Sequence, residues 1–429
     1  MGRVDIERNL REIVEEWFEQ ELPQDILPRD ITYSIADEIQ AIIGPRRAGK
    51  TYFMYQIIMD LLQNRYSRRD LVYIDFEDPR LTGFRGQDLG LFLKIIREYF
   101  NWKPILFLDE VQNISGWSKF VRTLHSKGFK IFISGSSSKL LSKEIASELR
   151  GRCKSIKVFT FSFREYLKAK NIDISTTTYL SKSSIRNHLR TYLLVGGYPR
   201  VVLSEDTSLL RDYLDTIFYR DIVERHRIRD ITSLRLFQKT LLSSLGALLS
   251  INKVYNEFKS LGIKKSKKTL IEYLRYFIEA FFIVPVRKIG RYIEALRQPI
   301  KIYPIDTGFL NLTPHKSSFS IRMESIVAIE LYKKYGDQVY YWRDYSHREV
   351  DFVVTDGFTP LELIQVTHEL RYDDKAQYKR EVESLLRASR QLQCSNLKII
   401  TWEQEDLIKV GNREIKIIPL WKWLLNITT

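Results

Sequence analysis

The segment GPRRAGKT (residues 44–51) constrains this chain more than any other stretch. It has the pattern G-x-x-x-x-G-K-T, in which two glycines let the backbone approach a ligand where a Cβ would block it. Successive backbone N–H groups in such a loop bind anionic oxygens, as in loops that hold the phosphates of a nucleotide. The residues predicted to contact the nucleotide are Gly44, Pro45, Arg46, Arg47, Ala48, Gly49, Lys50 and Thr51.

The flanks of this loop predict a strand, then the loop, then a helix. EIQAIIG before it is typical of a short buried strand, and TYFMYQIIMDLLQ after it predicts a helix whose positive N-terminal end faces the phosphates. We expect Lys50 to reach the β- and γ-phosphates and the hydroxyl of Thr51 to bind Mg²⁺. The alternative, a chance match in a surface loop, does not account for both flanks.

A second predicted strand, PILFLDE (104–110), ends in two acids. A continuous apolar run is typical of a buried parallel strand, and ligands of open α/β sheets bind at the carboxyl ends of strands. We expect Asp109 to hold Mg²⁺, directly or through water, and Glu110 to orient and polarise the attacking water. A surface turn after a core strand would give the same residues, but the pairing with GPRRAGKT favours the nucleotide site.

Two further core strands are predicted, LVYIDFED (71–78) and the apolar start of KIFISGSSS (130–138). The second ends in a run of serines, whose hydroxyls could sense the γ-phosphate, and Ser136 is our candidate. The alternative is that these serines cap the next helix.

Composition limits the class of protein. A chain of 429 residues, 44% hydrophobic, can bury the cores of two or three domains. No stretch approaches the roughly 20 apolar residues of a membrane span, and the N-terminus lacks the apolar region of a signal peptide. Two cysteines, Cys153 and Cys394, and six scattered histidines give neither a disulfide framework nor a zinc ligand set. We therefore expect a cytoplasmic protein with no membrane partner.

The charge is strongly positive and concentrated. The net charge is +15, which suggests an anionic partner, most often a nucleic acid. Residues 251–301 carry twelve Lys or Arg and four acids, so this window holds +8, more than half of the total.

Within that window we predict two helices over 250–262 and 267–283, joined by a short basic turn, and then a β-hairpin over 284–305. This order is the outline of a winged helix-turn-helix, whose second helix would enter the DNA major groove. Lysine suits phosphates better than base edges, so we expect recognition of DNA shape or charge rather than sequence. The alternatives are a solvated helix face or a protein-docking module. The expected DNA contacts are Lys264, Lys265, Lys267 and Lys268 near the turn, and Arg287, Lys288 and Arg291 on the wing.

Five segments together resemble one family: GPRRAGKT, FLDEVQNISGW (107–117), ISGSSSKLLSKEIASELRGR (133–152), FSFREYL (161–167) and LVGGYPRVV (194–202). The chain is similar, over nearly its whole length, to archaeal and bacterial AAA+-type ATPases that carry a C-terminal domain of unknown function. The resemblance implies an α/β protein that uses ATP and Mg²⁺. It implies a P-loop AAA+ core (1–165), a helical lid or connector (166–240), a winged helix (241–300) and a restriction-endonuclease-like α/β domain (301–429).

The resemblance also implies residue roles. Asp109 and Glu110 look like the Walker B pair. Arg150 and Arg152, in ELRGR, look like candidates for a finger that reaches a neighbour's nucleotide, which only an oligomer can supply. The alternative for both arginines is a salt bridge inside the subunit. The Gly-Gly-Tyr-Pro segment (196–199) looks structural, a helix stop followed by a turn.

A restriction-endonuclease-like site needs clustered carboxylates for a divalent cation and a lysine to assist the attacking water. In the related pattern a helix supplies a Glu, one strand an Asp, and the next strand Glu-x-Lys. Glu324 and Asp351 fill the first two places, but in LELIQVTH the third place holds Gln365, with Thr367 instead of the lysine. We expect a vestigial nuclease site, with Glu349 or Glu362 as alternative ligands in other registers.

Three functions follow from these observations. The first is an oligomeric, ATP-driven motor that acts on DNA, with branched or junction DNA as a candidate substrate. The second is a nucleotide-dependent switch that regulates a protein partner. The third is an active DNA nuclease.

Overall fold

The computed structural model describes residues 3–135, 149, 151–174, 179–290, 298–315 and 317–427. It divides the chain into two compact units, Met1–Thr160 and Phe161–Thr429. The boundary between them lies close to the predicted end of the nucleotide-binding core, and the other predicted boundaries fall inside the second unit. In the described part of the chain, no helix combines the length and the apolar composition that a membrane crossing requires.

The first unit is built on a five-stranded parallel sheet with the strand order β2-β3-β4-β1-β5. Every residue of β1, β3 and β4 is buried, as expected for parallel strands that are covered on both faces. The core strands predicted from the sequence are therefore confirmed. The strands are β1 (Ile39–Ile43), β2 (Leu71–Asp75), β3 (Ile105–Asp109), β4 (Ile131–Gly135) and β5 (Cys153–Lys157).

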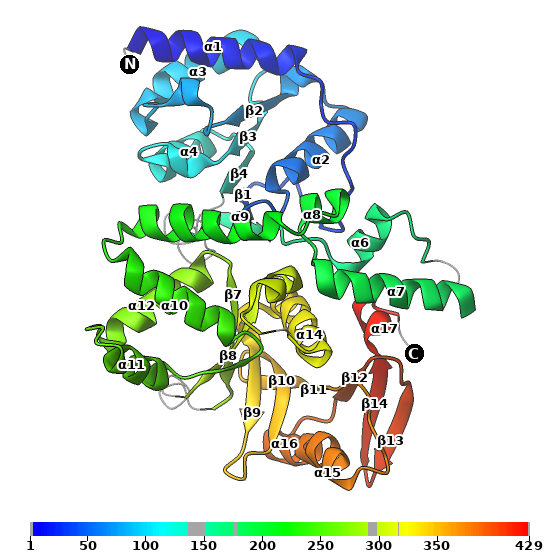
Figure 1. Ribbon diagram of the computed structural model, residues 1–429. Coiled ribbons are helices and arrows are strands. Elements are labelled where there is room, and N and C mark those ends of the chain that lie inside the picture. The colour runs from blue at the N-terminus through cyan, green and yellow to red at the C-terminus, as the bar shows by residue number, and fades with distance from the viewer. Residues whose placement is uncertain are drawn as a thin grey trace. The chain divides into compact units, whose positions relative to one another are not determined.

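Helices cover both faces of this sheet: α2 lies on one side, and α3 and α4 lie on the other (Figure 1). Helix α1 packs along the edge strand β2, where the indole Nε1 of Trp17 donates a hydrogen bond to the backbone oxygen of Leu71 at 2.9 Å. An edge strand that is covered in this way cannot pair with another chain. The helices are α1 (Arg3–Glu19), α2 (Lys50–Gln63), α3 (Leu89–Tyr99) and α4 (Trp117–Ser126).

The second unit begins with helices and continues into a mixed nine-stranded sheet, with the order β13-β14-β12-β11-β10-β9-β7-β8-β6. The first helices are α6 (Phe163–Ala169), α7 (Tyr179–Val195), α8 (Pro199–Ser204), α9 (Leu209–Thr216) and α10 (Ile231–Ser243). The strands are β6 (Ala247–Leu249), β7 (Ile283–Lys288), β8 (Ile300–Pro304), β9 (Val339–Arg343), β10 (Glu349–Asp356), β11 (Thr359–Val366), β12 (Leu397–Thr401), β13 (Asp406–Val410) and β14 (Arg413–Pro419). The later helices are α11 (Ile251–Ser260), α12 (Lys267–Glu279), α14 (Phe319–Tyr335), α15 (Lys375–Tyr378), α16 (Ser384–Leu392) and α17 (Leu420–Leu424).

The segments for which we predict a winged helix and an endonuclease-like domain share this sheet. Strand β7 pairs in parallel with β9, through Arg287 with Tyr340 and Lys288 with Tyr341. Strands β6 and β7 each pair antiparallel with β8. The basic window contains α11, α12, β7 and β8 in this order, which is the predicted order of two helices followed by two antiparallel strands.

Both predicted helices of the basic window are present, each capped by a serine that precedes it. Two details of the prediction are wrong. Helix α12 ends at Glu279 and not at 283, because Phe281 has a left-handed backbone (φ 54°) and Ile283 already pairs with β8. Helix α11 ends at Ser260 and not at 262, and Leu261, beyond its C-terminus, is 65% exposed.

The Gly-Gly-Tyr-Pro segment forms the predicted helix stop and turn. Helix α7 ends at Val195, Gly196 has φ 85°, and α8 begins at Pro199. The buried carboxylate of Asp306 accepts hydrogen bonds from the backbone N–H of Gly197 (2.8 Å) and of Gly308 (2.9 Å). A Cβ on residue 196 would lie 1.8 Å from Oδ1 of Asp306, so only glycine fits this turn.

We predict that Gly196→Ala strongly destabilises the second unit, because the new methyl group displaces Asp306 from its two donors. Gly357→Ala is the matched control, since Gly357 also has positive φ (59°) but open space around a Cβ. The control should cost about 1 kcal/mol for its backbone conformation alone, and Gly196→Ala at least about 2 kcal/mol more. Urea unfolding followed by circular dichroism measures both, and equal losses would show that the Asp306 contact is unimportant.

Candidate functional site

The GPRRAGKT loop joins strand β1, which lies between β4 and β5 in the sheet, to helix α2. Gly44 (φ 155°) touches the backbone of Val158 so closely that a Cβ would lie 1.9 Å from its carbonyl oxygen. Gly49 (φ 93°) and Arg47 (φ 62°) have left-handed backbones. Alternating right- and left-handed residues turn consecutive N–H groups toward one concave side, which is the geometry of an anion cradle.

The side chain of Lys50 lies within this loop and is only 6% exposed. Its ammonium donates hydrogen bonds to the carbonyl oxygens of Gly44 (3.2 Å) and Pro45 (3.0 Å). A buried ammonium at the N-terminus of α2 favours an anion at the mouth of the loop, because its charge adds to that of the helix dipole.

Arg29 supports the loop from outside, a role that the sequence did not signal. Its guanidinium is 8% exposed and donates to the carbonyl oxygens of Ala48 (2.9 Å) and Phe159 (2.7 Å). Its backbone N–H donates to the side chain of Gln56 on α2 (2.8 Å). Arg29 thus ties the phosphate loop to the segment after β5 and to α2.

Asp109 lies at the end of β3 and is 2% exposed. Its Oδ2 accepts hydrogen bonds from the hydroxyls of Thr51 (2.8 Å) and Tyr73 (3.0 Å). Its Oδ1 accepts from the backbone N–H of Glu110 (3.1 Å) and from the hydroxyl of Ser134. The structure therefore brings together the two residues predicted to hold Mg²⁺, Thr51 and Asp109, although 58 positions separate them.

Ser134 is a site residue that our prediction missed in favour of Ser136, which lies outside the described residues. Ser134 ends the apolar part of β4 and is fully buried. Its hydroxyl contacts Asp109 and also accepts a hydrogen bond from the N–H of Glu110 (3.1 Å). The signal for it was a hydroxyl within the predicted strand itself, whereas Ser136 was chosen from the serines that follow Gly135.

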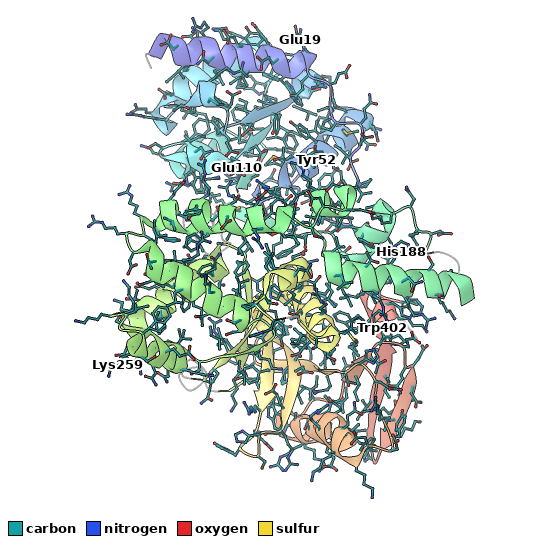
Figure 2. All side chains as sticks on the ribbon, viewed as in Figure 1. Glu19, Tyr52, Glu110, His188, Lys259 and Trp402 are labelled. Atoms are coloured by element: carbon teal, nitrogen blue, oxygen red, sulfur yellow. The ribbon has the colours of Figure 1, made fainter. Side chains whose placement is uncertain are left out.

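Glu110 follows Asp109 with a left-handed backbone (φ 48°), which turns the chain away from the strand. Its half-buried carboxylate accepts a hydrogen bond from the side-chain amide of Gln112. Figure 2 shows Glu110 and Tyr52, which lies on α2, on the same side of the unit. This position, next to Asp109, is compatible with the predicted role toward an attacking water.

The electrostatics at the strand ends favour a cation. Asp75 ends β2 opposite Asp109 in the sheet, and burial, together with the nearby charge of Asp109, raises the pKa of Asp75 to about 6. Burial raises the pKa of Tyr73 well above its usual value, so its hydroxyl stays a donor. A backbone cradle, a buried lysine, and a hydroxyl beside a carboxylate form a donor set that fits ATP with Mg²⁺.

Arg150 and Arg152 are the two candidates for the finger that reaches a neighbour's nucleotide. Arg150 lies outside the described residues. Arg152 immediately precedes β5 and is exposed, while its carbonyl oxygen accepts the N–H of Ile39 at 2.9 Å.

The basic surface has a group of exposed lysines and one ion pair. Lys264, Lys267 and Lys268 are exposed at the turn before α12 and in its first turn. Lys265 instead pairs with Asp230 at 2.6 Å, which raises the pKa of Lys265 and lowers that of Asp230 to about 2. The remaining predicted contacts are Arg287 and Lys288, half-buried at the end of β7, and Arg291, outside the described residues.

The predicted vestigial nuclease residues meet around a lysine that we did not predict. The ammonium of Lys301, on β8, contacts the carboxylates of Glu324 (3.0 Å), Glu349 (2.7 Å) and Asp351 (2.9 Å). Gln365 joins them, because its side-chain oxygen accepts the N–H of Asp351 at 3.2 Å. Of the two alternative ligands, Glu349 therefore belongs to this acidic cluster.

Glu362 is not part of the acidic cluster, since it pairs with Lys398 on the neighbouring strand. Burial and the charge of Asp351 raise the pKa of Glu324 to about 7. Burial alone would lower the pKa of Lys301, but the carboxylates, Asp351 first, hold it well above its usual value. Across the described ranges, no three His, Cys, Asp or Glu side chains are arranged to hold a metal ion.

We predict that Lys301→Met leaves uncompensated buried carboxylates and costs about 3–5 kcal/mol of unfolding free energy at pH 8. The loss should shrink toward pH 5, because the pKa of Glu324 is raised by burial and this carboxyl becomes neutral by binding a proton as the pH falls. Lys409→Met, in an exposed pair with Glu414, is the control and should cost under about 1 kcal/mol. Denaturant unfolding at both pH values tests this, and a loss independent of pH would contradict the charge argument.

Comparison with known proteins adds family information. An AAA domain matches residues 36–167, a domain of unknown function (DUF8612) matches 186–318, and a second one (DUF4143) matches 321–423. Among solved structures, the Walker-type ATPase PABY2304 of Pyrococcus abyssi is 14% identical, with coverage of 72% of this chain and 95% of that chain and a TM-score of 0.36. Cdc6p from Pyrobaculum aerophilum is 12% identical, with coverage of 76% and 94% and a TM-score of 0.25. Both TM-scores are below 0.5, so the fold assignment rests on the strand order and on the AAA match.

Two relatives align over most of their length. The uncharacterized protein MJ1544 of Methanocaldococcus jannaschii is 37% identical over 417 residues, which cover 94% of this chain and 91% of that protein. An uncharacterized protein of Haemophilus influenzae is 30% identical over 359 residues, which cover 81% and 86%. The chain therefore belongs to the family of these two proteins, and it is a P-loop ATPase of the AAA type.

Proposed function

We propose that the protein hydrolyses MgATP and couples the hydrolysis to action on DNA, as a homo-oligomer. The observation that carries the hydrolytic part is the contact of Thr51 with Asp109 at the mouth of a loop that contains a buried Lys50. Lys50 and Thr51 belong to α2 and Asp109 to β3. A buried carboxylate beside a hydroxyl is the arrangement that a phosphate-bound Mg²⁺ uses.

In this proposal each residue has one task. The loop N–H groups and Lys50 bind the phosphates, and Thr51 and Asp109 hold Mg²⁺, which when bound neutralises charge on the β- and γ-phosphate oxygens. Tyr73 and Ser134 keep the carboxylate of Asp109 oriented by donating to its two oxygens. Glu110, directly after it, orients the attacking water.

The DNA part of the proposal is supported by the exposed lysines before and within α12. Lys264, Lys267 and Lys268 form no ion pair among the described contacts, unlike Lys265. Such a group of ammonium ions binds phosphates without base specificity, so DNA shape, as in branched or junction DNA, would decide the preference. The same surface could dock an acidic protein, which is the competing hypothesis.

Two further features of the proposal rest on single observations. Arg152 is exposed just before β5, which leaves it available to a neighbouring subunit in an oligomer. In the acidic cluster, Lys301 lies among the carboxylates that a catalytic metal would need, and this supports a structural role rather than DNA cleavage.

We predict that Glu110→Gln lowers the rate of ATP hydrolysis at least about 100-fold without preventing nucleotide binding, because the amide cannot polarise water. The control is Glu12→Gln, because Glu12 is an exposed residue of α1. Phosphate release should be followed without DNA and with duplex, single-stranded and four-way-junction DNA. Stimulation by one DNA form is expected in the wild type. Hydrolysis that is indifferent to every DNA would instead favour the protein-partner switch.

We also predict that the double change Lys267→Ala/Lys268→Ala weakens DNA binding at low salt. Because each lysine releases about one counterion, the slope of log Kd against log salt concentration should fall by about 2. The matched control removes two exposed lysines from β13 and β14, Lys409→Ala/Lys416→Ala, and should leave the slope unchanged. Fluorescence anisotropy at several salt concentrations measures the slope, and equal slopes for both variants would argue against α12 as the DNA surface.

A further inference from the structure

A cavity of about 460 Å³ lies in the first unit, between α1, α2 and the carboxyl end of β2. Its volume is within the range of small-ligand sites. Figure 2 shows Glu19, one of its lining residues, at the C-terminal end of α1 and well apart from Glu110. The lining residues are Ile13, Glu16, Trp17, Glu19, Gln20, Tyr55, Tyr73, Asp75, Asp78 and Arg80.

The cavity lining carries an excess of negative charge. Arg80 pairs with Glu16 (2.5 Å) and with Asp78 (2.8 Å), so its single positive charge offsets only one of those two carboxylates. Glu19 and Asp75 remain. Within the described residues, Asp75 accepts a hydrogen bond from the backbone N–H of Glu77 (2.8 Å) and has no cationic partner. An anionic ligand would be repelled here, and a cation would be attracted.

Three aromatic residues, Trp17, Tyr55 and Tyr73, also line the cavity. The rings of Tyr55 and Tyr73 lie 4.9 Å apart, and those of Trp17 and Tyr73 lie 6.0 Å apart. Ring faces combined with carboxylates attract guanidinium and alkylammonium groups, whereas hydrated metal ions prefer oxygen ligands alone. One of the lining rings already makes such a contact within the chain. The guanidinium of Arg68 lies 4.5 Å from the ring centre of Trp17.

The cavity is connected to the nucleotide site by one side chain. Tyr73 lines the cavity with its ring and donates its hydroxyl to Oδ2 of Asp109 at 3.0 Å. The same oxygen accepts the hydroxyl of Thr51. A ligand that packs against Tyr73 therefore acts on the orientation of the carboxylate predicted to hold Mg²⁺.

We propose that this cavity binds a small organic cation with a guanidinium or alkylammonium group, and that binding changes the affinity of the nucleotide site for Mg²⁺. The binding step stands on the cavity alone. The coupling step rests on the proposed role of Asp109 in holding Mg²⁺.

Calorimetry of the full chain with butylguanidinium and with butylurea tests the binding step, since the two probes share a shape but differ in charge. We expect butylguanidinium to bind and butylurea to bind at least about 10-fold more weakly. Asp75→Asn should weaken butylguanidinium binding at least about 10-fold, while Glu12→Gln, outside the cavity, should not. Equal binding of the two probes, no binding of either, or unchanged binding by Asp75→Asn would overturn the proposal.

A second arm identifies the source of the cation. The peptide Gly-Arg-Gly presents the same guanidinium as part of a protein chain. Tighter binding of the peptide than of butylguanidinium would assign the site to an arginine of a protein partner, and the reverse order would assign it to a free small molecule.

The coupling step is measured as the Mg²⁺ concentration that gives half-maximal binding of a fluorescent ATP analogue. Saturating butylguanidinium should shift this concentration at least about 3-fold in the wild type. Tyr73→Phe keeps the ring but removes the hydroxyl, so it should bind the cation and abolish the shift. Binding without any shift in the wild type would overturn the coupling, and this readout needs no hydrolysis and no DNA.

Discussion

The carboxylate of Asp109 is the group on which the first unit depends. An ionised side chain that is 2% exposed is costly to bury unless it is hydrogen-bonded, and Asp109 has four donors, from Thr51, Tyr73, Ser134 and the backbone of Glu110. These donors belong to α2, β2, β4 and the end of β3. One buried charge therefore sets the relative positions of the phosphate loop and three neighbouring strand ends.

The second unit uses the opposite charge for the same purpose. The buried ammonium of Lys301 lies among Glu324, Glu349 and Asp351, which come from α14 and β10, while Lys301 itself comes from β8. A cation at this point joins the strands after the basic helices to the C-terminal α/β part. The continuous nine-stranded sheet has the same effect through its backbone, so the segments that we predict as separate domains share one framework.

Short sequence patterns predicted the helices and strands themselves more reliably than the residues at which they end. The strands β1 to β4 follow from short apolar runs, and the turn at Gly196 follows from its two glycines and a proline. The error at α12 arose because AFFI continues the apolar pattern of the helix, whereas the left-handed Phe281 and the pairing of Ile283 with β8 end it. A stretch of about ten residues of sequence does not show which distant strand a segment will pair with.

The sequence alone determined the phosphate loop, the acids at the end of β3 and the basic turn before α12, because each depends on backbone sterics, apolar periodicity or charge within one short segment. Only the tertiary structure decided that Ser134 contacts Asp109, that Arg29 supports the loop, that Lys301 lies among the carboxylates and that Tyr73 connects a cavity to the nucleotide site. These contacts join residues between 19 and 50 positions apart. Their partners are set by strand register and packing, which no local pattern specifies.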